Sequence, residues 1–227
     1  MGRLTLITFV CLPLAINLGA VRAWTQQPGY DLQSPNGKIQ IRIQTGERIT
    51  YDVLVNGKTV LRDCTLSIDI DRKTLGLNPK VKAAKPSAID REIEAVVRQK
   101  FAKVRENYKE LRLEMDGNYA VVFRAYNEGI AYRLETSLAQ PEVNVNGEEM
   151  ALNFAGDYSV YYPKEDSFFS HNEREFLYLP LKDIPQTSIA SLPAVVDTKD
   201  GIKVVIGESD VDDYPGLWLH GNSNNSL

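Results

Sequence analysis

The residues best suited to chemistry lie together in the segment 161–176. Its aromatic, acidic and amide side chains surround His171, Asn172 and Glu173. Such a segment, held between two strands, is typical of a loop that lines a polar pocket. The Glu173 carboxylate and the Asn172 amide oxygen suit a hard cation such as calcium, whereas zinc would need more nitrogen or sulfur ligands than His171 and His220 supply. The spacing alone leaves open that these are ordinary surface side chains bonded within the loop.

Other carboxylates are weaker candidates. The acidic run 208–213 lacks the central glycine and the distal glutamate of a calcium loop, so it predicts a solvated turn. Glu128 and Glu135 raise the question of a paired-carboxylate glycosidase, but seven positions separate them and they do not lie side by side on one strand. We expect no complete catalytic site there, and we expect the neighbouring side chains to form cross-strand stacking and a polar rim. These neighbours are Arg124, Tyr126, Tyr132 and Arg133.

The composition is that of an ordinary globular protein. The chain has 227 residues, of which 43% are hydrophobic and 25% charged, so it is long enough to bury a core. The net charge is −4, and lysines and arginines are scattered among acidic residues instead of forming a basic stripe. The sequence thus offers no continuous basic surface for a nucleic-acid phosphate backbone, so we expect no nucleic-acid partner.

The first residues predict export. A positive start at Arg3 and an apolar stretch over 4–20 precede small residues at Val21 and Ala23, which is the pattern of a secretory signal cleaved after Ala23. A membrane anchor is the alternative. Cleavage would leave a domain over 24–227 with no stable membrane span. Cys64 would then be the only thiol, so no internal disulfide forms, and we expect it to act as a small buried hydrophobe.

Short alternating segments dominate the rest of the chain. Residues 38–44 alternate polar and apolar side chains, and Asn56-Gly57 is the favoured pair for a tight hairpin. Many such segments at close spacing, with almost no helical period, predict an all-β fold built as a large antiparallel sandwich.

Several segments carry no strand pattern. We expect a solvated loop over 76–86, a loop or irregular strand over 98–109, and a flexible tail over 221–226, which offers little apolar surface. The apolar run 217–219 is followed by only eight residues, so we expect it to lack a packing partner within the chain.

Four segments in this order resemble the N-terminal domain of glycoside hydrolase family 97. They are Ser34-Pro35-Asn36-Gly37-Lys38, the hairpin Phe123 to Arg133, Ser170-His171-Asn172-Glu173, and Glu208 to Leu219. The resemblance covers about residues 30 to 220. It implies a sandwich of the galactose-mutarotase-like type, followed in the family by a TIM-type barrel and a small C-terminal β domain, in exported bacterial enzymes that act on alpha-linked glucosides or galactosides.

The resemblance also implies that this domain and the barrel contribute different residues to the active site. The family's catalytic carboxylates lie on the barrel, so we expect no catalytic residue in this chain. The carried-over residue is Glu173, which matches a carboxylate lent to a calcium site that the barrel completes, with His171 and Asn172 as pocket lining. The expected partners are the chain's own barrel and an oligosaccharide substrate, and the expected location is periplasmic or extracellular. The alternative is a non-catalytic carbohydrate-binding module that stacks sugars on aromatics such as Tyr126, Tyr132, Tyr161 and Trp218. A complete small glycosidase ranks last.

Overall fold

The computed structural model describes residues 29–227 except 210, 213 and 223. The predicted signal segment 1–23, with its cleavage point, therefore lies outside the described residues. Within them the chain is almost entirely extended, and a single short 3-10 helix, Leu181–Asp183, interrupts the strands. No helix among the described residues is long and apolar enough to cross a membrane.

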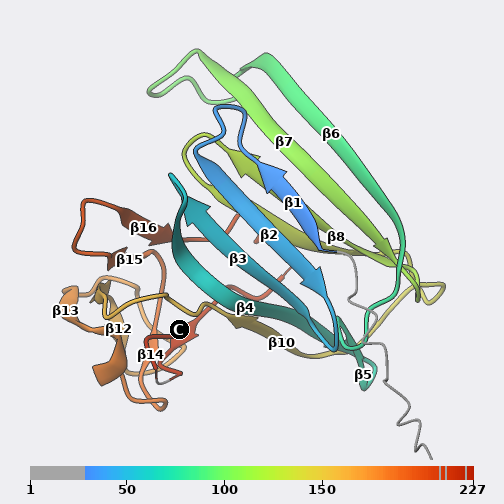
Figure 1. The fold of residues 1–227 in the computed structure, drawn as a ribbon. Coiled ribbons are helices and arrows are strands. Elements are labelled where there is room, and N and C mark those ends of the chain that lie inside the picture. Colours follow the sequence, from blue (N-terminus) through green and yellow to red (C-terminus); the bar gives the residue numbers. More distant parts are fainter. Residues whose placement is uncertain (1–28, 210, 213, 223) are drawn as a thin grey trace, which may run out of the picture.

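Two large antiparallel sheets face each other and form the body of the molecule (Figure 1). The first has the order β1-β2-β3-β4-β10, with β5 added beside β4, and the second has the order β6-β7-β8-β9. The first sheet comprises β1 (Tyr30–Gln33), β2 (Ile39–Thr45), β3 (Ile49–Val55), β4 (Lys58–Ile70), β5 (Lys73–Leu75) and β10 (Val145–Ala151). The second comprises β6 (Val81–Glu94), β7 (Lys103–Met115), β8 (Tyr119–Tyr126) and β9 (Ile130–Thr136). The prediction of an all-β antiparallel sandwich is confirmed.

The core between the sheets follows from the period of two in the strands. In β2, Ile41 and Ile43 are fully buried while Arg42 between them is exposed. Leu113 and Phe123 enter the same core cluster from the second sheet. Alternate side chains of a strand point to opposite faces, so each sheet supplies one apolar face to this core. The hairpin between β3 and β4 has the expected Asn56-Gly57 turn, with positive φ at both residues.

The expectation of a loop over 76–86 is wrong for its second half, because β6 begins at Val81. Likewise, the segment 98–109 is regular strand from Lys103 onward. β6 and β7 pair in one long hairpin whose outer part is held by cross-strand ion pairs, including Arg91 with Glu106 at 2.5 Å. Residues 92–94 and 108–115 carry enough strand pattern to be predicted, whereas 81–91 and 103–107 are marked by charged and not apolar residues, so their hydrophobic pattern is too thin to predict strands there.

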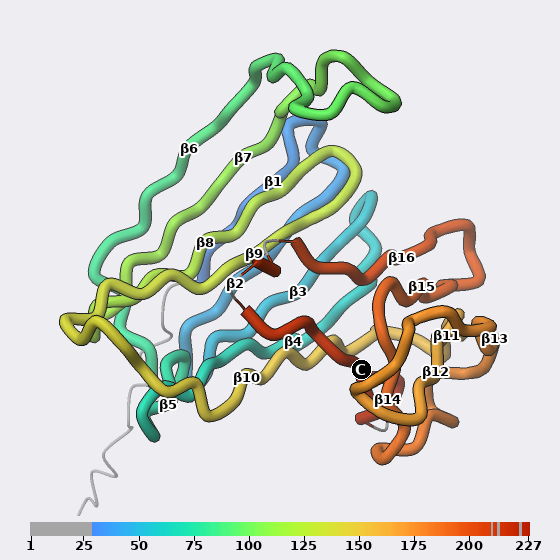
Figure 2. The backbone as a smooth tube through the Cα atoms, turned by 180° about the vertical axis from the view of Figure 1, so that it is seen from behind, coloured from blue at the N-terminus to red at the C-terminus, as the bar shows by residue number. Residues whose placement is uncertain are grey.

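Two smaller sheets lie to one side of the sandwich (Figure 2). Their orders are β13-β11-β15-β16 and β12-β14-β17. The first comprises β11 (Ser159–Tyr162), β13 (Leu177–Pro180), β15 (Ala194–Asp197) and β16 (Lys203–Ile206). The second comprises β12 (Lys164–Glu165), β14 (Ile189–Ala190) and β17 (Leu219–His220). Val160, Val196 and Leu219 join the same core cluster as the large sheets, so the small sheets extend the main core.

The end of the chain is bound to the fold, contrary to both expectations about it. Leu219 is buried and pairs with Ala190, so the run 217–219 does find a partner within the chain. Leu227 is also buried, and its backbone exchanges two hydrogen bonds with Leu152, of 2.8 and 3.1 Å. The order of the tail could not be predicted because it depends on pairing with residues about 75 positions earlier in the sequence, which no local pattern reveals.

Candidate functional site

A buried carboxylate anchors the loop that carries the predicted site residues. Glu165 is the last residue of β12, and none of its side chain is exposed. Its Oε2 accepts hydrogen bonds from Ser170 Oγ at 2.5 Å and Arg174 Nε at 2.7 Å, while Oε1 accepts one from Ser191 Oγ at 3.1 Å. Two of these donors belong to the loop and the third follows β14. Glu165 therefore fastens the loop to the small sheets at its base.

The donors around Glu165 favour its charged form. The Ser170 hydrogen bond, followed by the Arg174 and Ser191 hydrogen bonds, lowers the pKa of Glu165 below its ordinary value, against the opposing effect of burial. The Arg174 guanidinium also lies 3.4 Å from the exposed carboxylate of Asp166. A buried anion with three donors is satisfied, so it is a structural anchor and not a free acid or base.

The anchored loop presents three exposed residues in a defined turn. Asn172 has a φ of 58°, and its backbone N–H donates to Ser170 Oγ at 3.1 Å. The backbone N–H of Glu173 donates to Nδ1 of His171 at 3.0 Å. His171 Nδ1 therefore acts as a hydrogen-bond acceptor in this turn.

Glu173 is exposed, and its carboxylate has no hydrogen bond or ion pair to any residue that the structure describes. It is a hard oxygen donor open to solvent, which is the type calcium prefers. However, no group of three or more acidic, histidine or cysteine side chains in the described ranges is arranged to hold a metal ion. The described residues therefore supply one carboxylate of the predicted kind and not a complete metal site.

Glu165 and Arg174 are the residues that sequence analysis missed. Glu165 stands in the charged run Lys164-Glu165-Asp166 and looks like an ordinary surface residue. The one local signal was the position of this run, one residue after the mostly buried strand β11. Ser191, 26 positions away, gives no local signal at all.

The other predicted carboxylates do not come together. Glu135 pairs with Arg112 and with Arg133, the latter at 2.6 Å, and the Arg112 hydrogen bond lowers the pKa of Glu135. Glu128 is exposed in the turn that precedes β9, at the far end of the strand from Glu135. In the acidic run, Glu208 Oε1 accepts the backbone N–H of Leu217 at 2.6 Å, whereas 210 and 213 lie outside the described residues.

The aromatic residues of the hairpin divide between surface and core. Tyr126 lies against Tyr108, with ring centroids 5.0 Å apart, and the Arg124 guanidinium sits 4.4 Å from the Tyr108 ring centre. This is the cross-strand stacking expected for the outer face. Tyr132 instead packs between the sheets, 5.9 Å from Tyr51 and 6.0 Å from Phe123, so it is not a surface platform.

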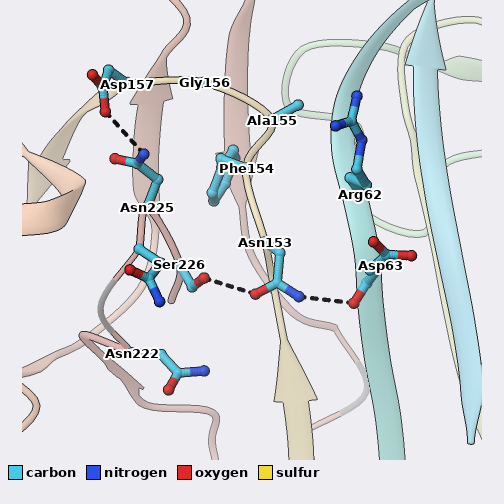
Figure 3. A pocket seen from close by; sticks show the side chains of 11 residues that line it. Arg62, Asp63, Asn153, Phe154, Ala155, Gly156, Asp157, Asn222, Asn225 and Ser226 are labelled. Carbon is cyan, nitrogen blue, oxygen red and sulfur yellow. Dashed lines mark hydrogen bonds between the residues drawn. The ribbon is translucent and has the colours of Figure 1, made fainter.

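A polar pocket of about 840 Å³ lies where β4, the segment after β10 and the tail meet (Figure 3). Asn153 stands at its centre, where its Nδ2 donates to the Asp63 carbonyl at 2.8 Å and its Oδ1 accepts from Ser226 Oγ at 2.7 Å. Asn225 Nδ2 donates to Asp157 Oδ1 at 3.0 Å. These bonds hold the tail in place, and the pocket contains none of the residues 161–176.

Comparison with known proteins identifies relatives along nearly the whole chain. The profile of the glycosyl-hydrolase 97 N-terminal family matches residues 32–227. A retaining alpha-galactosidase of Bacteroides thetaiotaomicron is 31% identical over 229 aligned positions, which cover 96% of this chain and 33% of that protein. The chain thus spans about a third of the length of this curated relative.

Two solved structures share the fold. A glycoside hydrolase family 97 enzyme from Pseudoalteromonas sp. strain K8, in complex with acarbose, superposes with a TM-score of 0.77 at 17% identity, over 87% of this chain and 31% of that chain. A beta-arabinopyranosidase superposes with a TM-score of 0.74 at 20% identity, over 87% of this chain and 34% of that chain.

Proposed function

Because the chain belongs to the glycosyl-hydrolase 97 N-terminal family, we propose that it is the N-terminal sandwich domain of an exported bacterial glycosidase that hydrolyses alpha-linked glucosides or galactosides. The observation that carries this proposal is the family match over residues 32–227. The name of the Bacteroides relative, a retaining alpha-galactosidase, supports the substrate class. Catalytic carboxylates would then lie on a TIM-type barrel that packs against the sandwich.

Within that enzyme, the role proposed for this chain is to lend the Glu173 carboxylate to a calcium site. Glu173 is exposed, and its carboxylate has no partner among the described residues, which supports this role. Calcium takes six to eight oxygen ligands, so a single carboxylate would need the barrel to supply the others. Bound there, the cation would position or polarise the substrate. His171 and Asn172 would line the same site.

The chain's own contribution to this site is stiffness. Glu165 holds Ser170 and Arg174 on either side of the exposed residues, so the loop is ordered before any ligand arrives. A preformed loop loses less conformational entropy when a metal or substrate binds. Dividing the ligands between two domains would also couple metal binding to domain docking.

Activity and calcium dependence test this proposal in the longer protein that includes the barrel. We expect that protein to hydrolyse p-nitrophenyl alpha-glucoside or alpha-galactoside, and the isolated chain to show no turnover. Glu173→Gln in the longer protein should raise the calcium concentration for half-maximal activity at least tenfold. The matched control is Glu175→Gln, since Glu175 is also exposed and lies on the same loop. Robust turnover by the isolated chain, abolished by Glu173→Gln, would contradict the proposal.

Export is tested separately by the mature N-terminus. Expression of the full sequence in a bacterium should place the protein outside the cytoplasm, and mass spectrometry should find Trp24 as its first residue. Retention of residues 1–23 in a membrane fraction would favour the membrane-anchor alternative.

A further inference from the structure

The sheet β13-β11-β15-β16 carries a row of apolar side chains on its outer face. The strand register places Tyr178 opposite Tyr161, Tyr161 opposite Val195, and Val195 opposite Val205. Residues that are directly opposite in a sheet share a face. The other face holds Val160, Val196 and Ile206, which are buried in the core. The row therefore crosses all four strands on the side that faces away from the core.

This row is exposed where an antiparallel sheet normally shows polar residues. Tyr161 is 39% exposed, Tyr178 is 52% exposed and Val205 is 66% exposed. An antiparallel sheet that packs on one side alternates apolar residues inward with polar residues outward. Four apolar residues in one outward row depart from that rule, and contiguous exposed apolar patches often mark binding sites.

The two tyrosines are held in a fixed arrangement. Their ring centroids are 4.7 Å apart with an interplanar angle of 42°. The Tyr178 hydroxyl donates to Asp197 Oδ2 at 3.1 Å, and the same carboxylate pairs with Lys203 Nζ at 2.5 Å. The Asp197 carboxylate is nearly enclosed and its charge is matched by Lys203, whose side chain is half exposed. The surface is thus aromatic in the middle, polar along one edge and locally neutral.

We propose that this row, which we call the tyrosine platform (Tyr161, Tyr178, Val195 and Val205), binds a neutral oligosaccharide. A pyranose ring has an apolar C–H face, which stacks on aromatic rings, and a hydroxyl edge, which needs hydrogen-bond partners. The platform offers both, because the half-exposed Lys203 ammonium lies beside the tyrosines. Fixed rings also lose little entropy on binding. The inference deepens the carbohydrate activity proposed above, but it depends on neither Glu173 nor calcium.

A protein partner fits the platform less well. From the exposed fractions, the row offers roughly 300–400 Å² of surface, about half of the ~800 Å² that each partner buries in a stable interface. A protein surface would also cover the Asp197–Lys203 pair, and removing such a pair from water is costly. A hydroxylated ligand would leave part of Lys203 in water and replace the rest of its hydration with hydrogen bonds.

Calorimetry on the full chain tests the proposal, with maltotriose and melibiose as probes. We expect at least one of them to bind with a dissociation constant in the millimolar range. Tyr161→Ala and Tyr178→Ala should each weaken binding at least tenfold, and Tyr178→Phe, which keeps the ring but releases it from Asp197, should weaken it a few-fold. Arg62→Ala in the polar pocket is a control that should bind like the wild type.

Tyr161→Leu and Tyr178→Leu, which keep apolar volume without the ring, guard against loss of folding in the alanine variants, and a thermal melt confirms that each variant is folded. The proposal is overturned if the wild type binds neither probe, or if folded tyrosine variants bind normally. It is also overturned if those variants change only self-association, measured by light scattering, since the platform would then contact protein. Hydrolysis and its Glu173 dependence in the longer protein are read out independently, so either idea can fail alone.

Discussion

Replacing Tyr162 with phenylalanine isolates one hydrogen bond that joins the two small sheets. The Tyr162 side chain is 1% exposed, and its hydroxyl donates to the Ser188 carbonyl at 2.9 Å, with the Leu219 carbonyl 3.3 Å away. Tyr162→Phe keeps the ring and its packing but leaves these carbonyls without that donor. The expected loss of unfolding free energy is about 1–2 kcal/mol, which for a chain of this length lowers the melting temperature by about 3–6 °C.

The neighbouring residue provides the matched control. Tyr161→Phe removes a hydroxyl from an exposed ring that makes no hydrogen bond within the described chain, so we expect a change below about 0.5 kcal/mol. Urea unfolding followed by tryptophan fluorescence gives both values. Equal stability of the two variants would refute the reasoning, because it would mean that the Tyr162 hydroxyl contributes nothing across the sheets.

The pH dependence provides a second check on Tyr162. Burial raises the pKa of this tyrosine above its ordinary value, so ionisation favours the unfolded chain. The neutral Tyr162 side chain therefore stabilises the fold fully below about pH 10, the pKa of tyrosine in the unfolded chain, and this stabilisation is lost as the pH rises above that value. The stability difference between the wild type and Tyr162→Phe should therefore shrink in alkaline solution.

Two further predictions concern buried polar groups. Burial raises the pKa of the Cys64 thiol to about 12. Iodoacetamide near pH 8 should therefore alkylate Cys64 roughly a thousandfold more slowly in the folded chain than in the chain unfolded by guanidinium, as measured by peptide mass spectrometry. Equal rates in the two states would show that the thiol is accessible in the folded chain. Glu165→Gln should speed hydrogen exchange at Asn172 and Glu173 about tenfold by loosening the loop, whereas Glu175→Gln should not. The pKa of Glu165 is lowered in the folded chain, so the ionised carboxylate stabilises the fold above the ordinary pKa of 4.5, and this stabilisation is lost as the pH falls below that value. The difference in stability between the wild type and Glu165→Gln should therefore disappear in acid.

The sandwich could be predicted where local pattern and burial agree. Residues 38–44 and the Asn56-Gly57 turn carry a period of two and a turn signal that need no distant partner. The part of β6 before residue 92 could not be predicted in this way, since most of its residues are exposed and the strand is held by pairing with β7. Leu227 could not be assigned either, because its partner Leu152 lies far away in the sequence.

The candidate site likewise contains residues that local composition predicts and one residue that it does not. The composition of 161–176 was enough to predict a polar loop that carries His171, Asn172 and Glu173, although these side chains are exposed and line no pocket among the described residues. The carboxylate that holds this loop was not predicted, because Glu165 differs from its charged neighbours only in being buried. Burial of a charged residue depends on donors contributed from elsewhere in the fold, and a single sequence does not reveal them.

The paired backbone of Leu152 and Leu227 has a mechanical consequence. A force applied at Leu227 acts directly on the two backbone hydrogen bonds that join it to Leu152. Any polypeptide joined after Leu227 would begin at a residue that is fixed to the sandwich. The orientation of its first residues relative to the sandwich would therefore be restricted.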